Sequence, residues 1–278
     1  MKVSFHEMQD NDLKWKVTHY DYSDEANSGQ VMYYNHGAAN VHKETKYTCP
    51  FHIVEDYEKT NYETSTTRNM QMIKLMGDKK PQHIICISLG SMWMLSPYSY
   101  QGMSNKACYI LNFKSIIFNT ENKLNIVVPE AQKRLLFSHS QGGWNAMVLI
   151  GGPSTKNMWS KAFFANPLIP IQPWKSMLPA DFALVDSRNA IYIMELNLNE
   201  KSYQDANFAS YGYKRAFDVT AQVLMSGAKD DIFKLYVSLY ELKDTLVDSF
   251  GLKNFDFKFP NGTHSHFVPW MAKNFFLS

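Results

Sequence analysis

The chain has 278 residues, of which 45% are hydrophobic and 14% aromatic, and its formal net charge is only +2 at pH 7. This charge balance argues against a nucleic-acid partner, and the aromatic content excludes a disordered chain. No apolar stretch approaches the ~20 residues of a membrane span. Without repeats or a Pro/Gly/Ser-rich linker, residues 1–278 are predicted to form a single domain.

The N-terminus and the cysteines bear on the compartment. Residues 1–12 are polar and acidic and lack the apolar core of a secretory signal, so we expect a cytoplasmic protein, with a processed secreted form as the alternative. Cys49, Cys86 and Cys108 show neither a CxxC pair nor a zinc-ligand spacing. We expect buried thiols, with one disulfide among them left open, and we predict no metal and no other cofactor.

Apolar runs predict the strands of the N-terminal half. Residues 15–22 are expected to form an early edge strand, and residues 30–35 form a clearer one. A helix is expected near residues 68–76. Residues 83–89 (HIICISL) are continuously apolar, which is typical of a buried parallel strand.

The middle of the chain continues this alternation and then departs from it. Residues 134–138 predict a strand, residues 144–150 a helix, and residues 161–169 contain a further strand. Residues 170–213 fit the alternation poorly. We therefore expect them to form an insertion or cap, whose aromatic side chains could line a pocket.

The C-terminal third is the most regular part. Residues 222–226 predict a strand, and apolar residues at steps of three and four predict an amphipathic helix over residues 232–250, capped by Gly251. Alternating phenylalanines predict a strand at residues 255–259, followed by a helix near residues 268–276. Strands that alternate with helices imply a mainly parallel central sheet with helices on both faces.

Residues 138–142 (SHSQG) lie between a predicted strand and a predicted helix and match the pattern small-x-Ser-x-Gly. A sharp turn there would project the Ser140 hydroxyl above the sheet, and it would crowd the positions two before and two after, which must therefore be small. The following helix would point its positive end at the reacting oxygen. Ser140 is therefore the expected nucleophile, and Ser88, in a looser match without a following helix, is its rival.

A nucleophilic serine also needs oxyanion donors. One expected donor is the backbone N–H of Gln141, and the second is that of Ala38, with Gly37 as the alternative, in the loop after the strand at residues 30–35. The side chains expected to contact substrate are those of His36, His139 and Trp144, with core packing as the alternative for the tryptophan.

The nucleophile needs a base, and the base needs an acid that orients it. His264 follows the last predicted strand and is the expected base, with His266 as its rival. The acid is expected after the preceding strand, where Asp230 and Asp231 stand together. One of them would orient the histidine, and the other would cap the following helix.

Three segments resemble motifs of a known enzyme group. Residues 138–146 (SHSQGGWNA), residues 227–233 (GAKDDIF) and the terminal histidine loop resemble the esterase D and S-formylglutathione hydrolase branch of the α/β-hydrolases. The loop NGTHS at residues 261–265, with Trp270 downstream, looks like the histidine loop of the mycobacterial mycolyltransferases. The resemblance covers about residues 30–40 and 130–275. It implies an α/β-hydrolase fold with a Ser-Asp-His triad, and the K-D-D-x-F pattern implies Asp231 as the acid, with Asp230 as the alternative.

The expected function is that of a serine carboxylic ester hydrolase that forms a covalent acyl-enzyme on a small-molecule ester. Acyl transfer to an alcohol or sugar is one alternative, which the mycolyltransferase-like loop suggests. A catalytically silent α/β-hydrolase fold that serves as a binding module is another. The sequence leaves the oligomeric state open.

Overall fold

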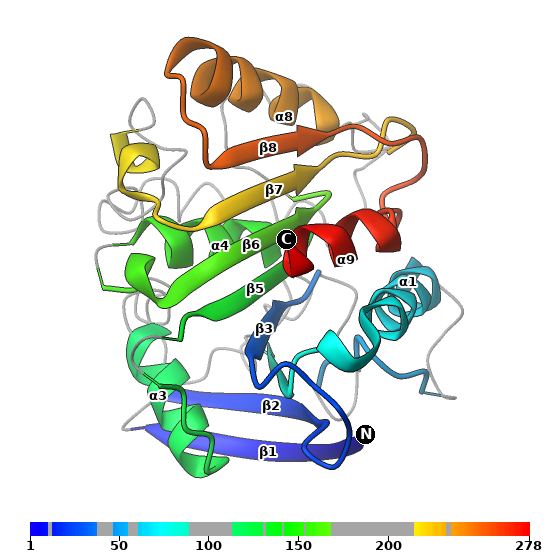
Figure 1. Cartoon of the computed structure of the whole chain (residues 1–278), viewed down its shortest axis with the longest axis vertical. Coiled ribbons are helices and arrows are strands. Elements are labelled where there is room, and N and C mark those ends of the chain that lie inside the picture. The colour runs from blue at the N-terminus through cyan, green and yellow to red at the C-terminus, as the bar shows by residue number, and fades with distance from the viewer. Residues whose placement is uncertain are drawn as a thin grey trace, which may run out of the picture.

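The protein is represented by a computed structural model, which describes residues 1–10, 13–37, 47–54, 61–88, 113–129, 132–140, 142–152, 154–167, 214–231 and 235–278. Within these residues, eight strands form one sheet in the order β1-β2-β4-β3-β5-β6-β7-β8 (Figure 1). The strands are β1 (Lys2–Asp10), β2 (Leu13–Asp21), β3 (Val31–Asn35), β4 (His83–Ser88), β5 (Arg134–His139), β6 (Trp159–Ala165), β7 (Gln222–Ser226) and β8 (Phe255–Lys258).

The described α-helices are α1 (Asn61–Met76), α3 (Phe113–Lys123), α4 (Gly142–Gly151), α8 (Leu235–Lys243) and α9 (Pro269–Leu277). Short 3₁₀-helices occupy Gly77–Lys79, Lys156–Met158 and Lys214–Asp218. A π-helical segment, Asp244–Ser249, prolongs α8, so the helical stretch ends close to where the apolar period predicts. Gly251 follows with a φ of +69°, and its N–H donates to the Val247 carbonyl, as expected of a capping glycine.

The sheet is mainly parallel, as predicted. Strands β4, β3, β5, β6, β7 and β8 pair in parallel, and β2 is antiparallel to both β4 and β1. The prediction of an edge strand at residues 15–22 is wrong in position, because β2 is the second strand and β1 forms the edge. Most residues of β1 are exposed or half-buried, so its sequence carries no continuous apolar run by which it could be recognised.

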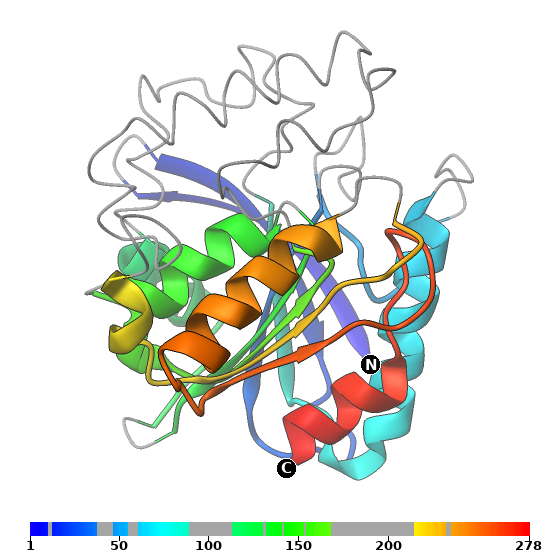
Figure 2. The ribbon, with the colours of Figure 1, turned by 90° about the horizontal axis from the view of Figure 1, so that it is seen from above.

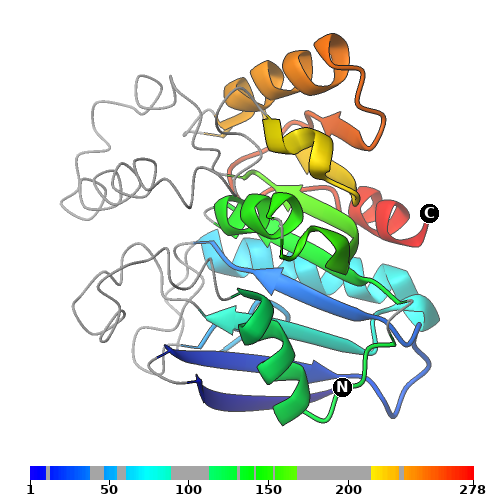
Figure 3. The ribbon, with the colours of Figure 1, turned by 90° about the vertical axis from the view of Figure 1, so that its left-hand side faces the viewer.

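Helices cover both faces of the sheet, and each face has its own hydrophobic core. Residues of α3, α4 and α8 pack with one set of strand residues, whereas residues of α1 and α9 pack with the alternate set. Figure 2 shows α4 and α8 on one side of the sheet and α1 and α9 on the other, and Figure 3 looks onto the side that α3, α4 and α8 cover. This three-layer arrangement follows from the period-2 alternation of strand side chains.

A buried polar network ties α3 to the sheet. Arg134 of β5 donates two hydrogen bonds of 2.6 Å to the two carboxylate oxygens of Glu121 on α3. The Tyr33 hydroxyl of β3 donates to Oε1 of the same carboxylate at 3.1 Å. Both charged side chains are more than 90% buried, so the bidentate geometry offsets the cost of removing the two charges from water.

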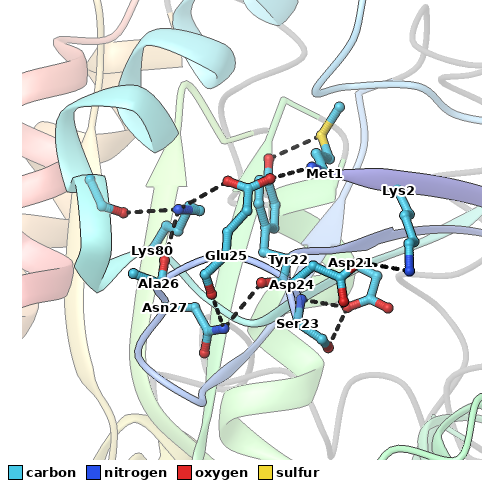
Figure 4. A network of polar contacts seen from close by, with 11 residues as sticks. Met1, Lys2, Asp21, Tyr22, Ser23, Asp24, Glu25, Ala26, Asn27 and Lys80 are labelled. Atoms are coloured by element: carbon cyan, nitrogen blue, oxygen red, sulfur yellow. Dashed lines mark hydrogen bonds and ion pairs between the residues drawn. The ribbon is translucent and has the colours of Figure 1, made fainter.

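The connection after β2 is held by Lys80 (Figure 4). The ammonium group donates to the Ala26 carbonyl at 2.8 Å and lies 3.3 Å from Oε2 of Glu25. The Asn27 side-chain amide donates to the carbonyls of Tyr22 and Glu25 within the same turn. These contacts fix the loop that leads into β3, at the end of the sheet opposite the site described below.

Two of the three cysteines lie in the described part. Cys49 and Cys86 are buried and free, and burial raises the pKa of the Cys49 thiol to about 12, so it is a thiol at neutral pH. Cys108 and the predicted insertion at residues 170–213 lie outside the described residues, and the single-domain organisation stays a prediction. Every helix in the described part is too short or too polar to span a bilayer.

Candidate active site

The site is built where several parallel strands end at the same edge of the sheet. Ser140 directly follows β5, Asp231 follows β7, and His264 follows β8. Because the carboxyl ends of parallel strands face one edge, residues far apart in the chain are brought together there.

Ser140 occupies a strained turn between β5 and α4. Its φ is +52°, a left-handed conformation that is uncommon for a residue with a Cβ atom. The Ser140 N–H donates to the Ala165 carbonyl at 3.0 Å, and the Gly143 N–H donates to the Ser140 carbonyl at 2.9 Å. These bonds hold the turn, which lifts the serine side chain away from the strand.

The turn leaves no room for larger neighbours. A Cβ atom added to Gly142 would lie 2.1 Å from the Asn35 carbonyl oxygen and 2.8 Å from that of His36. Ser138, two residues before the nucleophile, is completely buried against β6. The small residue that the pattern requires at its first position is therefore Ser138.

Ser140, His264 and Asp231 form a continuous chain of hydrogen bonds. The Ser140 Oγ lies 2.7 Å from His264 Nε2, and His264 Nδ1 lies 2.8 Å from Asp231 Oδ2. An ionised carboxylate can only accept, so Nδ1 carries a proton and the Nε2 lone pair of the neutral ring accepts from the serine hydroxyl. The Asp231 side chain is fully buried, which keeps water from competing for the histidine.

Asp230 and His266, the predicted alternatives, face other groups. The Asp230 carboxylate accepts from the Gly262 N–H at 2.8 Å, and the Asp230 N–H donates to the Gly262 carbonyl at 2.9 Å. A Cβ on Gly262 would lie 2.3 Å from His266 Cγ, and the φ of +136° also requires glycine. Burial, assisted by the nearby Arg68 charge, lowers the pKa of His266.

The expected oxyanion loop approaches the serine closely. A Cβ on Gly37 would lie 3.0 Å from His139 Nδ1 and 3.2 Å from Ser140 Cβ, so a larger residue would press on both. His36 is buried, and its Nδ1 donates to the Gly37 carbonyl at 2.8 Å. Three expected site groups lie outside the described part, namely Gln141, Ala38 and the side chain of Trp144.

His139, expected to contact substrate, turns its ring toward the histidine loop. It is 5% exposed, and its Nε2 donates to the His264 carbonyl at 3.1 Å. Burial and the neighbouring His264 lower the pKa of His139 to about 3, so the ring is neutral. A neutral ring with its proton on Nε2 has a lone pair on Nδ1, and this atom lies beside Gly37.

Solved structures of esterases share this arrangement of strands and helices. S-formylglutathione hydrolase FrmB from Staphylococcus aureus is 13% identical with a TM-score of 0.53, covering 98% of this chain and 94% of its own. A ferulic acid esterase is 14% identical with a TM-score of 0.59, covering 99% and 95%. Est1E from Butyrivibrio proteoclasticus is 11% identical with a TM-score of 0.57, covering 98% and 97%.

The chain has the α/β-hydrolase fold. The predicted fold class is thereby confirmed. No protein-family model matches the sequence, and no match was found among curated proteins. At such low identities the likeness establishes the fold, and the chemistry has to be argued from the residues themselves.

One residue of this candidate site was missed by sequence reasoning. Asn166 directly follows β6, has a φ of +45°, and is completely buried beside the His264 loop. The sequence offers no usable signal for it, because the strand predicted within residues 161–169 runs through position 166 and does not end before it. Within the described residues, no group of three or more His, Cys, Asp or Glu side chains is arranged to hold a metal ion.

Proposed function

We propose that this protein is a serine carboxylic ester hydrolase that works through a covalent acyl-enzyme. The observation that carries the proposal is the pair of hydrogen bonds, 2.7 Å and 2.8 Å long, that links Ser140, His264 and Asp231. The strained turn at Ser140 supports it, because such a turn presents the hydroxyl to a substrate above the sheet. The solved structures of similar fold include proteins named as esterases.

The first half of the reaction acylates the serine. Ser140 Oγ attacks the ester carbonyl carbon while His264 Nε2 takes its proton, and Asp231 stabilises the resulting imidazolium. The tetrahedral intermediate collapses, the carbon–oxygen bond to the alcohol breaks, and His264 gives the proton to the leaving alkoxide. We assign the oxyanion contacts to the N–H groups of Gln141 and Ala38, with Gly37 as the alternative, each worth roughly 3 kcal/mol.

The second half releases the acid. Water attacks the acyl carbon while His264 Nε2 takes one of its protons, and the acyl–oxygen bond to Ser140 breaks with return of that proton to Oγ. Every proton-transfer step uses the same imidazole, so His264 serves in turn as base and as acid in both halves of the reaction. The substrate is a small-molecule ester, for which the near-zero net charge of the chain is suitable.

The test is covalent labelling by an organophosphonate serine probe. We expect stoichiometric labelling of the wild type, none in Ser140→Ala, and full labelling in Ser88→Ala. Ser88 is the matched control because it is the rival serine of the sequence and is the last residue of β4 in the same sheet. A folded wild-type protein that takes up no label would overturn the proposal.

The acyl and alcohol preferences follow from a second measurement. A chain-length series of p-nitrophenyl esters, with Ser140→Ala as background, gives the acyl length that the site accepts best. An added acceptor alcohol then separates hydrolysis from acyl transfer. Hydrolysis predicts that the yield of free acid is unchanged by the acceptor.

A further inference from the structure

The loops that carry the proposed base and acid are tied together by one buried side chain. Asn166 stands at the carboxyl end of β6, between β5 and β7, and none of its surface is exposed to solvent. Its backbone N–H donates to the Ser226 carbonyl at the end of β7, at 2.7 Å. Its left-handed φ of +45° places the side chain across the neighbouring loops instead of along the strand.

The Asn166 amide makes three hydrogen bonds to two other loops. Nδ2 donates to the carbonyls of His264 at 2.6 Å and His266 at 2.8 Å. Oδ1 accepts from the Ala228 N–H at 2.7 Å. The orientation of the amide is unambiguous, because two carbonyls require the NH₂ group and an N–H requires the oxygen.

These contacts link the backbone near His264 to the backbone near Asp231, the two residues that must stay within hydrogen-bond distance of each other. Ala228 begins the turn that ends at Asp231, whose N–H lies 3.3 Å from the Ala228 carbonyl. On the other side, the His264 carbonyl accepts from both Asn166 and His139. Asn166 therefore holds the backbone at His264 and the turn from Ala228 to Asp231 (the acid turn) in place relative to each other.

We propose that Asn166 is a positioning residue, which keeps the His264 ring aligned between Ser140 and Asp231. It does so through its side-chain hydrogen bonds to the His264 loop and to the acid turn, which together are called the clasp. This inference rests on the proposed function. Asparagine suits the place because it tolerates a positive φ and offers two donors and an acceptor on a short side chain. Aspartate would lack the donors, and glycine would lack the clasp altogether.

Two variants distinguish the two arms of the clasp, which are the Nδ2 hydrogen bonds to the His264 and His266 carbonyls and the Oδ1 hydrogen bond to the Ala228 N–H. Asn166→Asp retains the oxygen that accepts from Ala228 but turns a second oxygen toward the carbonyls of His264 and His266. Asn166→Gly fits the backbone and removes both arms. Asn125→Gly is the matched control, because Asn125 also has a positive φ, of 55°, but is exposed at the end of α3.

Activity is measured as kcat and KM for p-nitrophenyl acetate, per active site titrated with the organophosphonate. We expect kcat to fall about 10- to 100-fold in both Asn166 variants with little change in KM, since small misplacements of a catalytic group have effects of this size. Asn125→Gly should retain the wild-type kcat. An unchanged kcat per titrated site in Asn166→Asp would overturn the inference, because a purely structural role lowers only the number of folded sites.

Hydrogen exchange tests the clasp independently of any activity, so it distinguishes this inference from the proposed function. The Ala228 amide should exchange faster in Asn166→Gly and remain protected in Asn166→Asp. If the Ala228 amide exchanges as fast in the wild type as in Asn166→Gly, the clasp is overturned, even if the enzyme hydrolyses esters. If neither variant folds, the wild type decides: protection of the Ala228 amide like that of β7 supports the clasp, and exchange as fast as in an exposed loop overturns it.

Discussion

Asp230 and Asp231 are adjacent in the sequence, but their carboxylates bind different parts of the same loop. Oδ2 of Asp231 lies 2.8 Å from the His264 ring, whereas Oδ2 of Asp230 accepts from the Gly262 backbone at the same distance. One carboxylate thus faces the imidazole, and the other fixes the turn that leads to it. Sequence spacing alone offers no means of separating the two roles.

Neutralising each aspartate in turn should therefore give unequal results. In Asp231→Asn we expect kcat for p-nitrophenyl acetate to fall about 10³- to 10⁴-fold, because an amide no longer holds the required tautomer or stabilises the imidazolium. Asp230→Asn keeps an acceptor for the Gly262 N–H and should cost about 1 kcal/mol of stability with kcat little changed. The comparison requires kcat and urea unfolding of both variants, and equal losses of kcat would contradict the assignment.

The crowding around Gly142 gives a second prediction. In Gly142→Ala the new methyl group would lie 2.1 Å from the Asn35 carbonyl oxygen, a backbone atom that cannot move aside alone. We expect a loss of about 3 kcal/mol or more in the free energy of unfolding, and loss of probe labelling as the turn shifts.

Gly29 is the control for this substitution. A Cβ there would meet no atom within 4 Å, and only its φ of +73° opposes alanine. Gly29→Ala should cost about 1 kcal/mol and leave labelling intact. Comparable destabilisation of the two alanine variants would show that the contact with Asn35 is not what excludes a side chain at Gly142.

Much of the fold could be predicted because the central strands are buried on both faces. β3, β4 and β5 read as continuous apolar runs for this reason, and the apolar period over residues 232–250 marks a helix with one buried face. The proposed triad was also accessible to sequence reasoning. Each of its members follows a predicted strand, and parallel strands bring their carboxyl ends together.

Other features leave no pattern in a linear sequence. β1 is largely exposed, and even Phe5 in its middle is 49% exposed, so burial imposes no apolar run there. Asn166 is a single residue whose partners at His264 and His266 lie 98 and 100 positions away. Its importance comes from a backbone conformation and from distant carbonyls, and neither is encoded in local composition.

The buried ion pair between Glu121 and Arg134 gives a third prediction. Glu121→Gln leaves the Arg134 charge buried with a neutral partner, and we expect urea unfolding to show a loss of about 3–5 kcal/mol. Glu7→Gln breaks the 2.6 Å pair with Lys16, in which Glu7 is 72% exposed, and should cost less than about 1 kcal/mol. A loss below 1 kcal/mol in Glu121→Gln would mean that water or a neighbour compensates Arg134.

A histidine on β2 should make the stability of the protein depend on pH. His19 is 7% exposed, and burial, with the neighbouring His83, lowers its pKa to about 4. Its Nε2 lies 3.1 Å from His83 Nδ1, which itself lies 3.5 Å from Asp21, and the His6 ring faces it with a centroid distance of 6.5 Å. The nearby carboxylate of Asp21 favours the charged form but does not overcome the effect of burial.

Because the folded state holds His19 neutral, the unfolded state binds the proton more readily between pH 6.5 and about pH 4. Stability from this group is full above pH 6.5 and is lost as the pH falls, by roughly 2 to 3 kcal/mol between pH 7 and pH 4.5. Between pH 7 and pH 4.5, the free energy of unfolding of His19→Gln, measured with urea, should fall by that much less than the free energy of unfolding of the wild type. His139 also lowers the stability as the pH falls, but it is present in both proteins, so its effect cancels in the comparison. If the stabilities of the two proteins change in parallel with pH, His19 makes no contribution.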